Sequence, residues 1–158
     1  MVVKINDEYD QHYVNEILQP QRVQELISRV QKNQRNGFHL LASTIYSGPP
    51  PKANVATNAD FILVHGNCLG QQPQRVTDSI EKVRTILGRP KPIVFNEDDN
   101  YNFDQPANNF FAAMSAHALW GYFDYRRKGE SFNGHFQCVP ADWAIGNDRK
   151  REFFGKFW

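Results

Sequence analysis

The chain has 158 residues and a formal net charge of +1 at pH 7, with 22% of its residues charged. This length suits one compact domain over residues 1–158 and is too short for a complete (β/α)8 barrel, which needs about 200 residues or more. The balanced charge gives no electrostatic case for binding nucleic acid or an anionic membrane. No apolar stretch approaches the roughly 20 residues of a transmembrane helix.

The first half of the chain alternates between predicted strands and a predicted helix. A short strand over residues 2–5 precedes a helix, Pro20–Lys32, in which apolar residues recur at helical spacing. A second strand, over residues 38–46, runs into three consecutive prolines at residues 49–51. Because proline disfavours an immediate helix, we expect the link to the next strand to be a loop with at most a short turn of helix.

The second half continues the same alternation. Residues 61–64 form the clearest buried strand, and a helix with one apolar stripe follows over Pro73–Leu87, ending at Gly88. The remaining predicted elements are a strand at 93–95, a helix at 106–118, a strand at 119–123, a polar loop at 126–147 and a final helix at 148–158. Regular alternation of this kind predicts an α/β fold with parallel strands and right-handed crossovers.

A polar or aromatic cluster follows each predicted strand. These clusters are Asp7-Glu8, Tyr46-Ser47, His65-Gly66-Asn67, Asn96-Glu97-Asp98 and Asp124-Tyr125. The carboxyl ends of parallel strands meet on one face, so we expect the clusters to converge. Three carboxylates directly after the buried strand at 93–95 are costly unless they are solvated, paired or functional, which makes Glu97 the central candidate for a site.

Two carboxylates on different strands, surrounded by His, Asn, Tyr and Trp, are the residue types that a glycosidase requires. One protonated carboxyl donates its proton to the leaving oxygen, and the other carboxylate attacks the anomeric carbon or stabilises positive charge there. A mechanism that retains the anomeric configuration needs the two carboxyls about 5–5.5 Å apart.

Four segments carry a resemblance to a known family. They read KPIVFNE at residues 91–97, INDEYD at 5–10, LWGYFDY at 119–125 and ADFILVHGN at 59–67. In their order they resemble the second half of a glycoside hydrolase of the large retaining TIM-barrel clan, clan A. The resemblance implies a partial (β/α)8 TIM barrel that contains roughly strands four to eight with their helices. The first three strands and most of the fourth are absent.

The same resemblance implies roles for individual residues. Glu97 matches the nucleophile at the end of the seventh strand, and Glu8 matches the acid/base residue at the end of the fourth. Asp7 precedes Glu8 where the clan has Asn. The residues implied to bind the sugar are His65, Asn67, Asn96, Tyr46, Trp120 and Asp124. No metal or organic cofactor is required.

Each of these residues also has a purely structural interpretation. Glu8 can favour the start of a helix through the helix dipole. Asp98 and Asp99 fit loop or capping positions better than catalytic ones. His65 is equally well explained as a structural histidine, and a tryptophan on a strand, such as Trp120, is more often part of the core than a sugar platform.

Two other functions compete with the glycosidase. The first is a non-catalytic carbohydrate-binding or interaction protein derived from a glycosidase barrel. A half-barrel exposes two sheet edges and a large apolar face, so we expect it to dimerise, find a partner half or aggregate. The second is an α/β enzyme that binds a metal through its carboxylates, which is disfavoured because no His or Asp spacing resembles a ligand set.

Cys68 and Cys138 also lack metal-site spacing, and whether they pair stays open.

Overall fold

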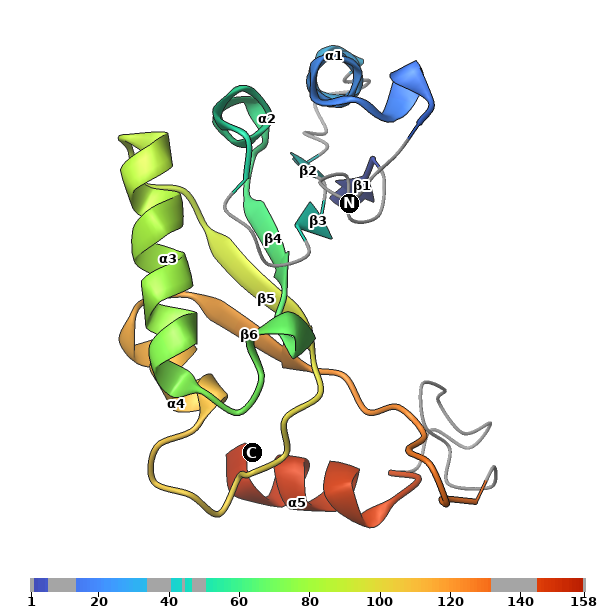
Figure 1. The fold of residues 1–158 in the computed structure, drawn as a ribbon, viewed down its shortest axis with the longest axis vertical. Coiled ribbons are helices and arrows are strands. Elements are labelled where there is room, and N and C mark those ends of the chain that lie inside the picture. Colours follow the sequence, from blue (N-terminus) through green and yellow to red (C-terminus); the bar gives the residue numbers. More distant parts are fainter. Residues whose placement is uncertain are drawn as a thin grey trace.

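The computed structural model describes residues 2–5, 14–33, 41–43, 45–46, 51–131 and 145–157 (Figure 1). The strands are β1 (Val2–Lys4), β2 (Leu41–Ser43), β3 (Ile45–Tyr46), β4 (Ile62–His65), β5 (Ile93–Asp98) and β6 (Leu119–Tyr122). The helices are α1 (Pro20–Lys32), α2 (Ala53–Asn58), α3 (Pro73–Leu87), α4 (Asn109–Ser115) and α5 (Asp148–Phe157), with short 3₁₀ turns η1 (Glu16–Leu18) and η2 (Asn67–Leu69).

The described strands pair in parallel and in the order of the sequence. β1 pairs with β2, and β3, β4, β5 and β6 follow one another across a second sheet. Only Thr44 separates β2 from β3 in the sequence. The predicted α/β fold with parallel strands is therefore confirmed. Among the described strands, the order within each sheet does not reverse, in contrast to doubly wound sheets, where ligands bind at the reversal.

One face of the second sheet carries the hydrophobic core. Ile62 pairs with Ile93 and Val64 pairs with Phe95, and all four side chains are at most 2% exposed. They belong to one cluster with buried residues of α3 and α4, and Figure 1 shows both helices on the same side of β4 to β6. Side chains alternate along a strand, so Leu119, which pairs with Val94, lies on the opposite face, where it is 58% exposed.

Helices α1 and α3 begin and end at the predicted residues. Each has a proline in its first turn, and Gly88 ends α3 with a left-handed φ of 62°. Helix α4 is shorter than the predicted span 106–118. It begins at Asn109 because the side chain of Asn108 caps it, accepting a hydrogen bond from the Phe111 amide at 3.0 Å.

Lys91 connects the start of β5 to the carboxyl end of α2. Its Nζ donates to the carbonyl oxygens of Ala56 at 2.8 Å and Thr57 at 2.6 Å, and to that of Ala59. These carbonyls lie at the negative end of the helix dipole, where a cation is favourable. Burial, followed by the charge of Arg89, lowers the pKa of Lys91 below its ordinary value.

The two faces of the sheet should respond differently to truncation. We expect Phe95→Ala to lower the free energy of unfolding by about 3–5 kcal/mol, because it empties a fully packed site. Leu119→Ala on the neighbouring strand should cost less than about 1 kcal/mol, because its side chain is largely solvated. Urea denaturation of both variants measures the difference, and equal losses would show that the outer face is covered.

Candidate functional site

The carboxyl ends of β4 and β5 lie side by side and bring two predicted site residues together. His65 is paired with Asn96 in the sheet register, and the Gly66 amide donates to the Asn96 carbonyl at 2.7 Å. The Nε2 atom of His65 lies 3.4 Å from Oε1 of Glu97. The His65 side chain is 3% exposed and that of Glu97 is 32% exposed, so the carboxylate is accessible to a ligand while the imidazole is enclosed.

Glu97 occupies a β-bulge with an unusual backbone conformation. Phe95 pairs with Trp120 and Asp98 with Tyr122, so Asn96 and Glu97 together lie opposite the single residue Gly121. Glu97 has a φ of 54°, in the left-handed region that glutamate rarely adopts. Such a conformation costs on the order of 1–3 kcal/mol and persists only where the surroundings hold it. The bulge re-aims the Glu97 side chain, as bulges next to functional sites commonly do.

Asp98 is the most completely bonded carboxylate at this edge. It is fully buried, and its Oδ1 accepts from the backbone amide of Asn100 at 3.1 Å and from Nδ2 of the same residue at 2.5 Å. Its Oδ2 accepts from Nδ2 of Asn109 at 2.9 Å and from Nε1 of Trp120 at 2.7 Å. Asp98 is the last residue of β5 and not a loop residue. The local sequence did not indicate this role, because the donors to Oδ2 come from Asn109 and Trp120, in later elements of the chain.

Trp120 lies in an aromatic cluster instead of at the exposed edge beside Glu97. Its ring packs against Phe103, Phe110, Tyr122 and Phe153 of α5, with centroid distances of 5.7 to 6.4 Å. It also packs against the buried core, in register with Phe95. These contacts agree with the structural interpretation of this residue.

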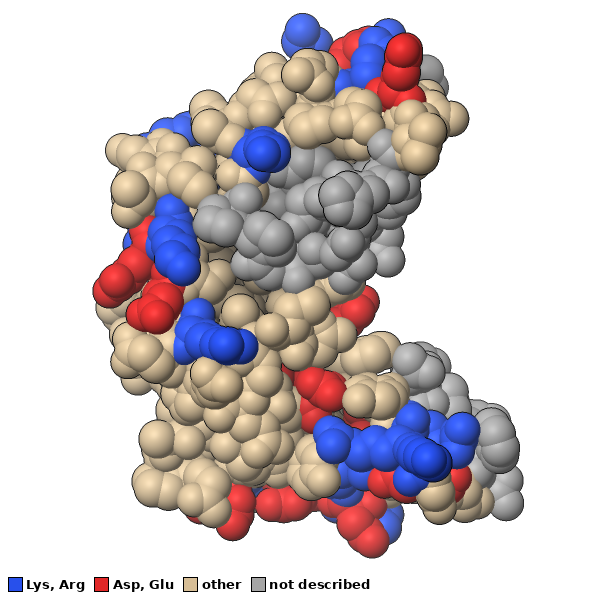
Figure 2. Space-filling model, in the orientation of Figure 1, with Lys and Arg blue, Asp and Glu red and all other residues tan. Residues whose placement is uncertain are grey.

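Asp124 forms part of a second polar cluster, which holds α5. It is 5% exposed and accepts from the Tyr122 hydroxyl at 3.2 Å, from Asn147 Nδ2 at 2.5 Å and from Arg149 Nε at 2.8 Å. Arg149 also pairs with Glu130. Figure 2 shows Lys and Arg side chains gathered over the segment after β6 and beside α5, below a hollow in the surface. The ion pair between Asp124 and Arg149 thus joins the segment after β6 to α5.

Charges in this second cluster shift several pKa values. Hydrogen bonds from the Arg149 side chain and then from the Arg127 backbone amide lower the pKa of Glu130 to about 2. Burial, followed by the charge of Asp124, raises the pKa of Tyr122 far above its ordinary value. The hydrogen bonds to Glu130 are the largest cause that raises the pKa of Arg149.

The structure describes only part of the remaining predicted site residues and their surroundings. Asn67 begins η2 directly after β4 and is exposed, and Asn96 is partly buried, with its Oδ1 reached by no donor among the described residues. Tyr46 ends β3, beside Val64, but its side chain lies outside what the structure describes. Glu8 lies outside the described residues, as does Cys138.

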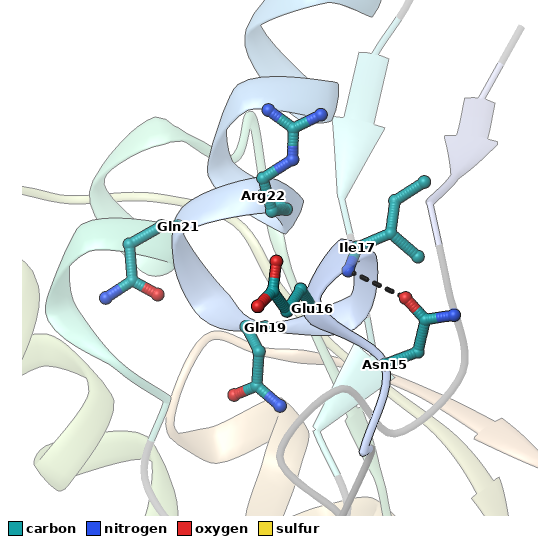
Figure 3. A pocket seen from close by; sticks show the side chains of 6 residues that line it. All are labelled: Asn15, Glu16, Ile17, Gln19, Gln21 and Arg22. Carbon is teal, nitrogen blue, oxygen red and sulfur yellow. Dashed lines mark hydrogen bonds between the residues drawn. The ribbon is translucent and has the colours of Figure 1, made fainter.

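A shallow pocket of about 680 Å³ lies elsewhere, at the start of α1 (Figure 3). Asn15 caps the η1 turn there, its Oδ1 accepting from the Ile17 amide at 3.1 Å. The residues that line it are Asn15, Glu16, Ile17, Gln19, Gln21 and Arg22. The pocket shares no residue with the Glu97 site, and Arg22 is already paired with Glu25.

The described residues contain neither a group of metal ligands nor a membrane-spanning helix. Across residues 2–5, 14–33, 41–43, 45–46, 51–131 and 145–157, no three His, Cys, Asp or Glu side chains are grouped as ligands for a metal ion. In the same part of the chain, no helix is long and apolar enough to span a membrane. Comparison with known proteins found no matching family model, no matching curated protein and no matching solved structure.

We expect Gly66→Ala to destabilise the protein by about 1–3 kcal/mol through overpacking. A Cβ atom at Gly66 would lie 2.5 Å from Cβ of Asp98, although the backbone conformation itself suits alanine. The matched control is Gly155→Ala in α5, where an added Cβ meets open space and alanine should stabilise the helix by about 0.5–1 kcal/mol. Thermal unfolding distinguishes the two, and a Gly66→Ala variant as stable as the parent contradicts the close approach.

The lowered pKa of Glu130 predicts a pH-dependent contribution to stability. Because the pKa is lower in the folded state than the ordinary 4.5, the stabilisation is present above pH 4.5 and is lost as the pH falls toward about 2. The parent should therefore exceed Glu130→Gln in stability at pH 6 and lose this advantage in acid. In an Arg149→Met background the pH-dependent difference should become smaller, because only the contribution of Arg127 to the lowered pKa of Glu130 remains. A difference of unchanged size in that background would assign the effect to another group.

Proposed function

We propose that the chain is a retaining glycoside hydrolase-type protein that cleaves O-glycosidic bonds with Glu97 as its nucleophile. The observation that supports this most is the position of Glu97, which lies in a bulge at the carboxyl edge of parallel strands, beside a buried histidine. This edge is where parallel α/β folds bind ligands.

The geometry suits an attacking carboxylate. Glu97 is exposed enough to meet a substrate, whereas its backbone is held in one conformation between bonded neighbours. His65 is close enough to orient the carboxylate, and Asn67 and Asn96 lie near the same edge to contact sugar hydroxyls. In this proposal Glu8 protonates the leaving oxygen, a role that rests on its sequence resemblance. The proposed reaction uses the two carboxyls and needs no cofactor.

We place these strands in a partial (β/α)8 barrel. The strand order follows the sequence without reversal, and consecutive helices from α1 to α4 contact one another. Among the described residues, β1 has only β2 as a neighbour and β6 has only β5. These edges, together with exposed Leu119, support a partner half-barrel, such as a second copy, that completes the sheet.

A mechanism-based inhibitor tests the role of Glu97. A 2-deoxy-2-fluoroglycosyl fluoride slows breakdown of the covalent intermediate, so the sugar accumulates on the nucleophile. We expect mass spectrometry to find the added sugar on the peptide that contains Glu97, and Glu97→Gln to lose both labelling and turnover of aryl glycosides. Labelling of another carboxylate would overturn the assignment.

The control for the second carboxyl is Glu8→Gln. Loss of a general acid should impair substrates with poor leaving groups far more than activated aryl glycosides, which depart without protonation. Equal losses on both substrates contradict the acid role of Glu8. Binding of oligosaccharides without any turnover by the unaltered protein would instead favour the carbohydrate-binding alternative.

A further inference from the structure

Glu97 is held between two fixed points of the backbone. On its amino side, the carbonyl of Asn96 accepts the Gly66 amide from the neighbouring strand. On its carboxyl side, Asp98 accepts four hydrogen bonds through its side chain, and its carbonyl accepts the Phe123 amide at 2.9 Å. The strained φ of Glu97 lies between these two points.

We infer that Asp98 is a positioning residue, whose buried carboxylate holds Glu97 in its left-handed conformation facing His65. Its functional importance rests on the proposed nucleophilic role of Glu97. The four donors reach Asp98 from the following turn, from α4 and from β6, so the carboxylate joins three segments at the end of β5. Hydrogen bonds to a charged acceptor are stronger than neutral ones, and burial adds to their strength.

The chemistry of these contacts requires a carboxylate. Each of its two oxygens faces two N–H donors, and an ionised carboxylate is an acceptor at both oxygens. In Asp98→Asn one oxygen is replaced by an NH₂ group, which then faces two donors whichever way the amide turns. The variant keeps the shape of the side chain and disrupts only the hydrogen bonds.

Close packing explains why this carboxylate can act on Glu97. The space between Gly66 and Asp98 would not hold a single methyl group, so the residue that follows His65 is in direct contact with the end of β5. A shift of Asp98 toward β4 would therefore displace Gly66. The neighbouring Asp99 differs, since its carboxylate is 3.8 Å from Arg127 and its carbonyl accepts from that residue.

A double-mutant cycle read by NMR tests the inference without a substrate. The imidazole chemical shifts of His65 report on the nearby Glu97 carboxylate, so Glu97→Gln should displace them. We expect this displacement largely to disappear in an Asp98→Asn background and to persist in the matched control, Asp99→Asn. An equal displacement in the parent and Asp98→Asn backgrounds would show that Asp98 does not position Glu97.

A check that the variants are folded and a measurement of their activity complete the test. If circular dichroism shows that Asp98→Asn is unfolded, Asn100→Ala replaces it in the cycle, because this change removes only the 2.5 Å donor. Where the protein hydrolyses aryl glycosides, Asp98→Asn should lower kcat on the order of 10²-fold with little change in KM, whereas Asp99→Asn should change neither. If the unaltered protein does not hydrolyse aryl glycosides, the proposed function is overturned and the positioning role of Asp98 is not. If the protein is active but Glu97→Gln displaces the His65 shifts equally with and without Asp98→Asn, only the positioning role is overturned.

Discussion

The buried carboxylate of Asp98 is the interaction on which the carboxyl edge of the sheet depends. A charge removed from water is unfavourable unless polar groups replace the lost hydration, and four N–H donors do so here. Those donors lie on separate segments, so satisfying the charge also aligns α4, β6 and the turn after β5. The same residue therefore serves both the fold and the geometry of Glu97.

The bulge at Glu97 shows how strain is maintained at this edge. An unfavourable φ requires neighbours that are more firmly fixed than the strained residue itself. The Gly66–Asn96 hydrogen bond and the Asp98 network provide such neighbours on either side. The strained residue places an accessible carboxylate against an enclosed imidazole.

Helix α5 is fixed by two kinds of contact, one to the segment that follows β6 and one to β6 itself. Arg149 joins Asp124 to Glu130, and Phe153 packs against Tyr122 and Trp120. Because Trp120 also donates to Asp98, a chain of contacts runs from α5 to the residue beside Glu97. An element at the end of the chain thus supports the candidate site without contributing a residue to it.

The local sequence determined the helices whose ends and apolar faces depend only on neighbouring residues. The apolar spacing of α1 and α3, their first-turn prolines and Gly88 act within a few residues, and the predicted spans match the structure. The parallel α/β class and the meeting of His65 with Glu97 follow from regular alternation, because parallel strands present their carboxyl ends on one face. Only tertiary structure decided the bulge, the burial of Asp98 and the direction of Trp120. Each depends on hydrogen bonds and packing between segments far apart in the chain, for which no local pattern exists.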